Sequence, residues 1–409
     1  MRRPMYFTAL SAAVLSLTGC GDDDKTSNVP VATGPPVETE VPNTNYQPAF
    51  AGQTRANGAQ TTTPYTSGVI TSALSSPWGI TSLPDGRLLI TEKGGALRIV
   101  TQAGNVGNPI TGLPAVNPEG QGGLLGICID PDFTNNRMVY WVFSEAAAGG
   151  NLTAVAKGRL SDNDTAIESA TVIYRANPAN SSVLHYGGRI LFDKTGNLYV
   201  STGERSVLET RPLAQSVSSG LGKIIRIDTN GQAAAGNPGF TGTSALPELF
   251  SIGHRNPQGI ALHPVTGELW QSEHGPRGGD EINRVKAGAN YGWPTITYGI
   301  EYSGEPIGAA IQQQDGLEQP VYYWDPVVSP SGMTFYKGNK IPEWQNNLFI
   351  GALSGSHIVR LVIDNNNKVV GEERLLAGEN QRFRDVTQAA DGALYAITDQ
   401  GRLYKIDKQ

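Results

Sequence analysis

From residue 68 onward the chain is dominated by one recurring pattern, a tight turn rich in Gly or Asn followed at once by a short apolar strand. The turns are centred on positions 86, 136, 196, 267, 347 and 392, which places successive copies 50, 60, 71, 80 and 45 residues apart. Each interval has room for one four-stranded antiparallel sheet and its loops. No long amphipathic helix interrupts the pattern. We therefore predict an all-β chain built from six similar units.

Six units of this size predict a six-bladed β-propeller of four-stranded antiparallel blades. A propeller closes its blades into a ring around a central channel, which leaves only short, protected sheet edges. A pair of β-sandwiches and a β-helix are the competing architectures, but a β-helix would repeat with a much shorter and more regular period. In a propeller, the loops at one end of the channel are the place to look for a site.

The first residues have the features of a bacterial export signal. Arg2 and Arg3 precede an apolar run from Met5 to Leu17, which is too short to span a bilayer but suits a signal-peptide core. The run ends in Leu17-Thr18-Gly19-Cys20, which resembles the bacterial lipoprotein box, so we expect Cys20 to become a lipidated N-terminus. An ordinary secretory signal with a chance cysteine is the alternative.

These features predict three regions: a signal peptide over 1–19, a disordered tether over 20–60 that begins with the lipidated Cys20, and a propeller domain over 61–409. The tether is rich in Asp, Pro, Thr, Asn and Gly and buries too little apolar surface to offset the entropy of ordering. We therefore expect a protein of the bacterial cell envelope, anchored to a membrane by lipid and facing the periplasm or another extracytoplasmic surface.

Charge and motif content exclude several classes of function. With 31 basic and 37 acidic residues the net charge is −6, so nucleic acid is not an expected partner. Two cysteines, at 20 and 128, cannot build a disulfide scaffold or a multi-cysteine zinc site. The chain has no P-loop, no dinucleotide fingerprint and no Gly-x-Ser-x-Gly elbow. Redox chemistry would therefore require a bound cofactor.

A histidine and a glutamate flank one predicted hairpin. His185 precedes its first strand and Glu204 follows its second, so the hairpin returns the carboxylate to the imidazole's end of the blade. A carboxylate beside a histidine orients the ring and raises its proton affinity, as a general base requires. A structural hydrogen bond at a blade corner is the alternative interpretation.

Arg255, Arg382 and Arg384 place permanent positive charges on loops of an acidic protein. Arg382 and Arg384 project to the same side of an extended strand, because side chains two residues apart share a face. Together the three arginines would hold a planar ligand with several carboxylates. Ion pairs with Asp385 or Asp280 are the alternative.

A glycine-rich loop carries a possible cation site. Glu273, Asp280 and Glu281 flank Gly275-Pro276-Arg277-Gly278-Gly279, where backbone carbonyls are free to point at an ion. Carboxylate oxygens combined with carbonyls favour calcium over zinc.

Taken in order, these segments resemble the soluble quinoprotein sugar dehydrogenases, that is, the glucose/sorbosone dehydrogenase family and within it the PQQ-dependent aldose sugar dehydrogenases. The resemblance extends from about residue 68 to residue 408. Its specific stretches include Gly122-Gly123-Leu124-Leu125-Gly126, Gly253 through Gly259, Gln271-Ser272-Glu273-His274-Gly275-Pro276, Asn290-Tyr291-Gly292-Trp293-Pro294 and Arg382-Phe383-Arg384-Asp385-Val386. The family's six-bladed propeller agrees with the repeat count.

The resemblance implies oxidation of an aldose at C1 to a lactone, with an electron acceptor that remains unidentified. By this resemblance His185 is the base that takes the proton of the anomeric hydroxyl, Glu204 is its acidic partner, and the C1 hydrogen leaves as hydride to the quinone. Arg255 with Asn256 would bond the ortho-quinone oxygens, where charge develops. The residues implied to bind PQQ are Gln121, which would contact sugar or cofactor, Arg255, Asn256, Tyr302, Arg382 and Arg384.

The resemblance also implies calcium. The carbonyls of Gly275 and Pro276 match those that bind the ion that polarises the quinone. Glu281 and Tyr291 match a second, structural calcium site.

Two positions depart from the soluble glucose dehydrogenase branch. Ser354 stands where that branch has a cofactor-binding lysine, and Trp324-Asp325-Pro326 only approximately matches a tryptophan that walls its sugar pocket. A non-catalytic propeller that binds carbohydrate or protein, and a calcium-dependent propeller lactonase, are the alternative functions.

Overall fold

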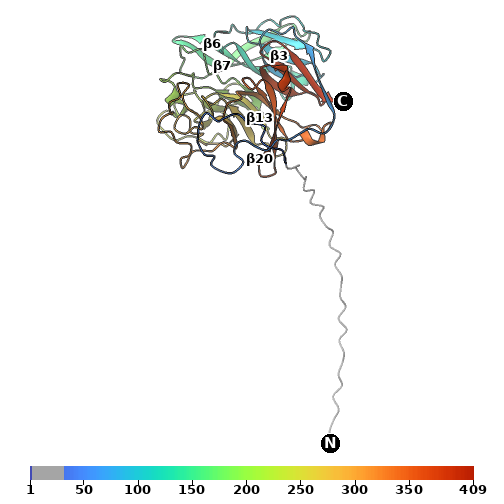
Figure 1. Cartoon of the computed structure of the whole chain (residues 1–409). Helices are drawn as coiled ribbons and strands as arrows, with labels where there is room; N and C mark the ends of the chain where they lie inside the picture. The colour runs from blue at the N-terminus through green and yellow to red at the C-terminus, as the bar shows by residue number, and fades with distance from the viewer. Residues whose placement is uncertain (2–31) are drawn as a thin grey trace.

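The computed structural model describes Met1 and residues 32–409, and within them the chain forms six small antiparallel sheets arranged in a ring (Figure 1). The predicted six-bladed β-propeller is confirmed. The predicted signal peptide, apart from Met1, and the lipidated Cys20 lie outside the described residues. No helix in the described part of the chain is long and apolar enough to cross a membrane.

The blades follow one another in chain order. Blades 1 and 2 consist of β2 (Pro77–Ser82), β3 (Leu88–Glu92) and β4 (Ala96–Val100), then β5 (Leu124–Ile129), β6 (Met138–Ala147), β7 (Gly150–Leu160) and β8 (Ile167–Arg175). Blades 3 and 4 consist of β9 (Ile190–Phe192), β10 (Leu198–Thr202), β11 (Lys223–Ile227) and β12 (Leu249–Ile252), then β13 (Pro257–Leu262), β14 (Leu269–Glu273), β15 (Asp280–Val285) and β16 (Tyr322–Trp324).

Blades 5 and 6 complete the ring. They consist of β17 (Pro330–Phe335), β18 (Leu348–Ala352), β19 (His357–Ile363) and β20 (Val369–Leu375), then β21 (Phe383–Gln388), β22 (Leu394–Thr398), β23 (Leu403–Lys408) and β1 (Tyr65–Thr71). Helical segments in the described residues are single turns, namely α1 (Phe133–Asn136), η1 (Arg211–Ala214), η2 (Pro342–Trp344) and η3 (Ala377–Glu379).

Each predicted turn lies between the first and second strands of a blade. Gly86, for example, lies between β2 and β3, and Gly196 lies between β9 and β10. Their φ angles of 87° and 82° belong to the left-handed region, which glycine adopts without a steric penalty. The repeat in the sequence is therefore the signature of the hairpin that begins every blade.

The two ends of the propeller domain close the ring by pairing with each other. Strand β1 runs antiparallel to β23, with Tyr65 opposite Lys408 and Thr71 opposite Leu403. In Figure 1 the blue strand accordingly lies beside the red one. Blade 6 thus takes its outer strand from the start of the domain. Hydrogen bonds between the first and the last strand of the domain therefore close the ring.

The apolar core lies between neighbouring blades. Trp141 of blade 2 is buried against Leu89 and Leu97 of blade 1, and Trp270 of blade 4 is buried against Leu348 of blade 5. The six inner strands β2, β5, β9, β13, β17 and β21 surround a cavity of about 300 Å³ on the axis. This packing makes the ring a rigid support for its loops.

One blade departs from the predicted four strands. Blade 1 has three, and its outer edge is instead met by two isolated bridges, Val100 with Val106 and Leu97 with Ile110.

The inner strands are irregular where they begin. Five of them shift register near their first residues, at Pro77/Gly79, Leu124/Ile127, Pro257/Gly259, Pro330/Met333 and Phe383/Asp385. Such bulges bend a strand and redirect its side chains. The sixth inner strand, β9, is only three residues long. Its late start leaves residues 182–189 free to form a loop, and this loop carries His185.

Residues 32–60, predicted to belong to a disordered tether, instead pack along blades 4 and 5. The backbone N–H groups of Asn43 and Thr44 donate to the Asp325 carboxylate at 2.8 and 3.0 Å, and Ala59 donates to the Glu372 carbonyl at 2.8 Å. The prediction considered only the apolar area that this segment can bury. The segment is held mainly by hydrogen bonds to buried acceptors, a contribution that composition does not reveal.

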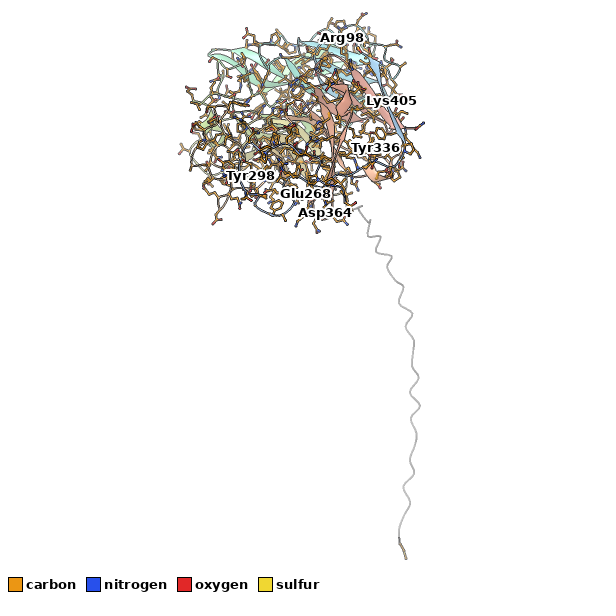
Figure 2. All side chains as sticks on the ribbon, in the orientation of Figure 1. Arg98, Glu268, Tyr298, Tyr336, Asp364 and Lys405 are labelled. Atoms are coloured by element: carbon orange, nitrogen blue, oxygen red, sulfur yellow. The ribbon has the colours of Figure 1, made fainter. Side chains whose placement is uncertain are left out.

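This segment also helps to enclose a second cavity. A space of about 680 Å³ lies between Ala32–Gly34 and the ends of β13 and β19. Asp364, which follows β19 and is labelled in Figure 2, lines it together with His263, which follows β13. Inner strands such as β13 finish at this end of the ring, so the cavity lies away from the end where the bulges occur.

Candidate active site

A cavity of about 400 Å³ opens where the inner strands begin. Segments of all six blades contribute to its wall, which includes Trp78, Lys93, Gln121, Tyr186, Gly187, Asn256, Gln258, His274, Ser329, Leu353, Arg382, Arg384 and Asp399. A concave space of this volume with several converging polar groups is of the size that small ligands occupy.

His185 and Glu204 form the predicted pair beside this cavity. The hairpin of β9 and β10 brings Nδ1 of His185 to 2.6 Å from Oε1 of Glu204, and both side chains are buried. The N–H of Glu204 donates to the carbonyl of Arg255 at 2.9 Å, which ties the pair to the next blade. Nε2 of His185 makes no hydrogen bond to any described residue, so this nitrogen is available to accept a proton.

Burial and nearby charges set the protonation of the pair. Burial lowers the pKa of His185 well below its usual value, and the guanidiniums of Arg255 and Arg205 lower it further. Burial raises the pKa of Glu204 to about 7, although Arg255 opposes that shift. The imidazole is therefore neutral near pH 7, which is the state that can act as a base.

The backbone of His185 is held in an unusual conformation. Its φ of 46° lies in the left-handed region, which residues with a Cβ rarely adopt. Gln121 supports it, because its Oε1 accepts the His185 N–H at 2.8 Å and its own N–H donates to the Val183 carbonyl at 2.8 Å. Gly203 packs so closely that a Cβ there would come within 2.1 Å of the His185 carbonyl oxygen. Gln121, predicted to contact sugar or cofactor, lines the cavity and also positions the histidine.

Arg255 lies close to the pair, as predicted. Its Nη1 donates to the carbonyls of His274 and Gly275 at 3.0 and 2.7 Å, and its N–H donates to the Glu273 carboxylate. Tyr302 is exposed, and its hydroxyl lies 3.4 Å from Nη2 of Arg255. The structure thus brings Tyr302 to the arginine rather than to the cavity wall.

Two buried donors, one on the cavity wall and one on the residue before it, lack acceptors among the described residues. Asn256 receives hydrogen bonds on Oδ1 from the Gly187 N–H at 3.1 Å and from Gln258 at 3.3 Å. Its Nδ2 and the Nε of Arg255 are buried without a partner among the described residues. Two unused donors on consecutive residues suit a ligand rich in oxygen atoms, such as a quinone.

Arg382 and Arg384 share one face of blade 6, as their spacing predicts. Nε of Arg382 lies 2.9 Å from Asp399, Nε of Arg384 lies 2.8 Å from the same carboxylate, and all three side chains line the cavity. The alternative pairing with Asp385 or Asp280 is wrong. One carboxylate balances two arginines here, so this corner of the cavity retains a positive charge that suits an anionic ligand.

Asp385 instead pairs with Arg189, and both line the axial cavity rather than the site cavity. Their buried ion pair joins blades 3 and 6, and Nη2 of Arg189 also donates to the carbonyl of Arg384 at 2.9 Å. The Arg189 guanidinium lies 4.1 Å from the centre of a Trp78 ring. The hydrogen bond from Arg189 fixes the backbone of Arg384, whose side chain lines the site cavity.

The glycine-rich loop is held firmly in place. Oδ1 of Asp280 accepts the Gly275 N–H at 2.8 Å, and Oδ2 accepts the Val328 N–H at 2.8 Å. Gly275 and Pro276, predicted to offer carbonyls to calcium, therefore lie in a fixed turn next to Arg255. No cluster of three or more His, Cys, Asp and Glu side chains suited to a metal occurs in the part of the chain that the structure describes. A cation here would depend on carbonyl oxygens.

The residues predicted for a second calcium ion lie in the same blade. Glu281 faces Glu273 across β14 and β15, and burial together with this neighbouring carboxylate raises the pKa of Glu281 to about 8. A cation would relieve that repulsion. The Tyr291 hydroxyl donates to the carbonyl of Arg284, so the backbone carbonyl of Tyr291 is the group left for an ion.

Trp324 and Ser354, the two positions that depart from the soluble glucose dehydrogenase branch, lie at different distances from the cavity. Trp324 is buried within blade 4 and its Nε1 donates to Glu372 at 3.0 Å, so it does not wall the cavity. Ser354 lies 2.8 Å from Ser329, which is on the cavity wall. Ser354 thus lies directly behind a residue of the cavity wall.

Sequence reasoning missed Asp399, although a signal was present. An acidic residue follows the turn of four blades by six to eight residues, at Glu92, Glu204, Glu273 and Asp399. In each blade this position lies at or just beyond the end of the second strand. Alignment of the repeats would have found the set, whereas Trp78 and Arg189 have no comparable signal.

Comparison with known proteins identifies the family. The family model described as glucose/sorbosone dehydrogenase matches residues 74–405. The chain belongs to the glucose/sorbosone dehydrogenase family. The predicted membership is confirmed, and the match covers every residue of the candidate site.

Individual relatives agree with this family. The aldose sugar dehydrogenase YliI of Escherichia coli is 41% identical over 343 residues, which cover 83% of this chain and 91% of the relative. A crystal structure of a glucose dehydrogenase superposes with a TM-score of 0.80 at 44% identity and covers 83% of this chain and 99% of that one. The PQQ-bound form of an aldose sugar dehydrogenase from Streptomyces coelicolor gives a TM-score of 0.69 at 28% identity and covers 85% of this chain and 99% of that one.

Proposed function

We propose that this chain is a PQQ- and calcium-dependent dehydrogenase that oxidises aldose sugars at C1 to lactones, with His185 as the base. The observation that carries the proposal is the buried His185–Glu204 pair, in which Nε2 has no partner among the described residues. Tyr186 and Gly187, which follow His185, line a cavity bordered by cationic side chains. The names of the relatives, which include an aldose sugar dehydrogenase and a PQQ-bound enzyme, support the same chemistry.

His185 removes the proton from the anomeric hydroxyl. Its neutral imidazole has Nε2 free, while Nδ1 is held by Glu204 at 2.6 Å. The carboxylate fixes the ring and stabilises the imidazolium as the proton arrives. When bound, PQQ would supply the two-electron acceptor for the C1 hydrogen, which would leave as hydride, and calcium would supply a Lewis acid.

The residues present fit PQQ. The charge of Arg382 and Arg384, only partly balanced by Asp399, would bind the cofactor's carboxylates. The unpartnered Nδ2 of Asn256 and Nε of Arg255 would donate to its oxygen atoms and stabilise negative charge there.

The residues also offer oxygen ligands for calcium. The carbonyls of Gly275, which also accepts a hydrogen bond from Arg255 at 2.7 Å, and of Pro276 lie in the turn fixed by Asp280 and would hold the catalytic ion. Glu281, raised in pKa by its neighbour Glu273, and the Tyr291 carbonyl would hold a second ion.

Reconstitution of the purified chain tests the proposal. We expect anaerobic addition of PQQ and calcium to give a bound-quinone absorbance that a single addition of aldose bleaches, with lactone formed in equal amount. His185→Gln is expected to bind PQQ with the same absorbance and to lose the bleaching step. Full turnover by that variant would remove the assigned base, and lactone hydrolysis without PQQ would favour the lactonase.

The export signal supports a second part of the proposal, that the enzyme is lipid-anchored through Cys20 and faces an extracytoplasmic space. Expression with labelled fatty acid is expected to label the wild-type chain and to leave Cys20→Ser unlabelled. A wild-type chain without label would contradict the anchor.

A further inference from the structure

Arg205 is a buried cation without an acidic partner in ion-pair contact among the described residues. Its side chain is fully buried in the loop that follows β10, directly after Glu204. Two of the other buried arginines form ion pairs, Arg189 with Asp385 and Arg360 with Glu373 at 2.7 Å, whereas Arg255 at the site, like Arg205, has none among the described residues. An unpaired buried charge is destabilising, so this position calls for an explanation.

The guanidinium of Arg205 binds the loop that leads into His185. Nε donates to the Leu184 carbonyl at 2.9 Å, and Nη2 donates to the Ser182 carbonyl. Nη1 and Nη2 also reach the backbone and side-chain oxygens of Asn151 at 3.1 and 2.5 Å, and the guanidinium stacks 4.0 Å from the Tyr186 ring centre. Arg205 therefore joins blade 2 to both sides of the histidine.

These contacts act where the backbone is strained. His185 itself has a φ of 46°, and the carbonyl of the residue before it is one of the acceptors of Arg205. A non-glycine residue in this region persists only when its surroundings hold it there. The guanidinium and Gln121 hold the peptide from opposite sides, at the Leu184 carbonyl and at the His185 N–H.

Arg205 also acts on the imidazole through its charge. The charged groups that face His185 are Arg205, Arg255, Arg211, Glu204 and Glu273. The three cations lower the pKa of His185, while Glu273 raises it. Removal of the Arg205 charge would therefore raise the pKa of the histidine.

We propose that Arg205 is a positioning residue for the base, which fixes the 182–185 loop so that the imidazole is held against Glu204 with Nε2 free. The inference rests on the proposed function of His185. It adds to that function a residue that touches neither substrate nor cofactor.

Three variants test the inference. Arg205→Met removes both the positive charge and the planar guanidinium with its N–H donors. Arg205→Lys keeps the charge but loses the planar set of donors. Arg360→Met is a matched control. Arg360 is equally buried and bonds the Glu343 carbonyl and Asn347 at 3.1 and 2.7 Å, but it lies in blade 5, away from the site. Each protein is tested for folding by its melting temperature and for cofactor binding by PQQ absorbance.

We expect Arg205→Met to lower kcat about 10²-fold with little change in the KM for sugar, because the base is misplaced rather than the binding groups. The acid limb of its kcat/KM profile should move to higher pH, because His185 becomes easier to protonate. Arg205→Lys should also lose kcat but keep the position of that limb. Arg360→Met should melt at a lower temperature with an unchanged kcat and profile.

A second readout needs no turnover. The chain has five histidines, and the signal of His185 is the one missing from the NMR spectrum of His185→Gln. In apoprotein we expect its titration to move to higher pH in Arg205→Met and not in Arg360→Met. Wild-type kcat and an unmoved titration in a folded Arg205→Met, or wild-type kcat in Arg205→Lys, would overturn the proposal. A fully active His185→Gln would instead refute the base and leave the titration result standing.

Discussion

Two neighbouring blades carry the same pair of residues at the same spacing, with different surroundings. His185 and Glu204 in blade 3 are 19 residues apart, as are His254 and Glu273 in blade 4. In both pairs Nδ1 of the histidine faces the carboxylate, at 2.6 Å and 3.0 Å. The spacing reflects the hairpin, which returns the acidic residue to the end of the blade where the histidine lies.

The difference is at Nε2. His254 is fully buried, its Nε2 is 2.8 Å from the hydroxyl of Ser251, and its ring stacks on Tyr291 at 4.8 Å. Nε2 of His185 has no partner in the described chain, and the residues that follow His185 line the cavity. The histidine of such a pair can act as a base only when its Nε2 has no hydrogen-bond partner. Spacing alone therefore could not decide between the catalytic and the structural interpretation.

The largest expected effect comes from exchanging the same side chain in the two pairs. His185→Gln should lower kcat by roughly 10²- to 10⁴-fold, the usual contribution of a general base, with a small change in melting temperature. His254→Gln should lower the free energy of unfolding by about 1–3 kcal/mol for each buried group left unpaired. Parallel steady-state kinetics and urea unfolding separate the two. Equal losses of kcat in both variants would contradict the distinction.

Glu204→Gln should change how stability depends on pH. The folded pKa of Glu204, about 7, lies above the ordinary value of 4.5, so its stabilising contribution is complete below pH 4.5 and is lost as pH rises towards 7. The variant lacks that loss, so its stability relative to wild type should rise by up to about 3 kcal/mol across this window. His185, with a lowered pKa, contributes in the opposite direction and remains in both proteins.

Urea unfolding of both proteins at several pH values between 4.5 and 8 provides the measurement. A difference between the two that does not vary with pH would show that the carboxyl is not shifted. The same data from His185→Gln would isolate the contribution of the imidazole.

Much of the fold could be predicted because its signal is local. The turn at Gly86 and its five counterparts each precede the second strand of a blade, and turn residues are recognisable within a few positions. The site residues His185, Arg255 and Arg384 were found for a related reason, since they lie beside those strands. What could not be predicted depends on contacts between distant parts of the chain.

The N-terminal segment and the ion pairs illustrate this limit. Residues 32–60 pack because Asp325, about 280 positions further on, is a buried acceptor for Asn43 and Thr44. Arg189 meets Asp385 across 196 positions, and Trp324 proves to be a core residue of its blade. Such contacts between distant residues form only when the ring closes. Neither the composition nor the periodicity of the sequence can therefore predict them.

A smaller effect on stability is expected when the His254–Glu273 pair loses the hydrogen-bond partner of its Nε2. Ser251→Ala removes the partner of Nε2 in His254 and should lower stability by about 1–3 kcal/mol. It should not create a second base, because His254 remains fully buried away from the cavity. The sharpest form of the experiment adds Ser251→Ala to His185→Gln and measures turnover of the reconstituted enzyme. Recovered turnover in the double variant would show that a free nitrogen suffices without access to the cavity.

The smallest expected effect concerns the loop that follows the second pair. Nδ2 of Asn43 donates to Asp325 at 2.9 Å, and Oδ1 of Asn43 accepts from Arg277 at 3.0 Å, so the N-terminal segment holds the 275–279 loop from outside. Loss of one such bond is worth about 1 kcal/mol, so Asn43→Ala should speed hydrogen exchange in that loop by about fivefold. Thr62→Ala, which loses a hydrogen bond to Glu343 at the other end of the segment, is the matched control. Equal exchange in both variants would show that the segment merely covers blades 4 and 5. Faster exchange confined to Asn43→Ala would show that residues preceding the matched family region support the carbonyls assigned to calcium.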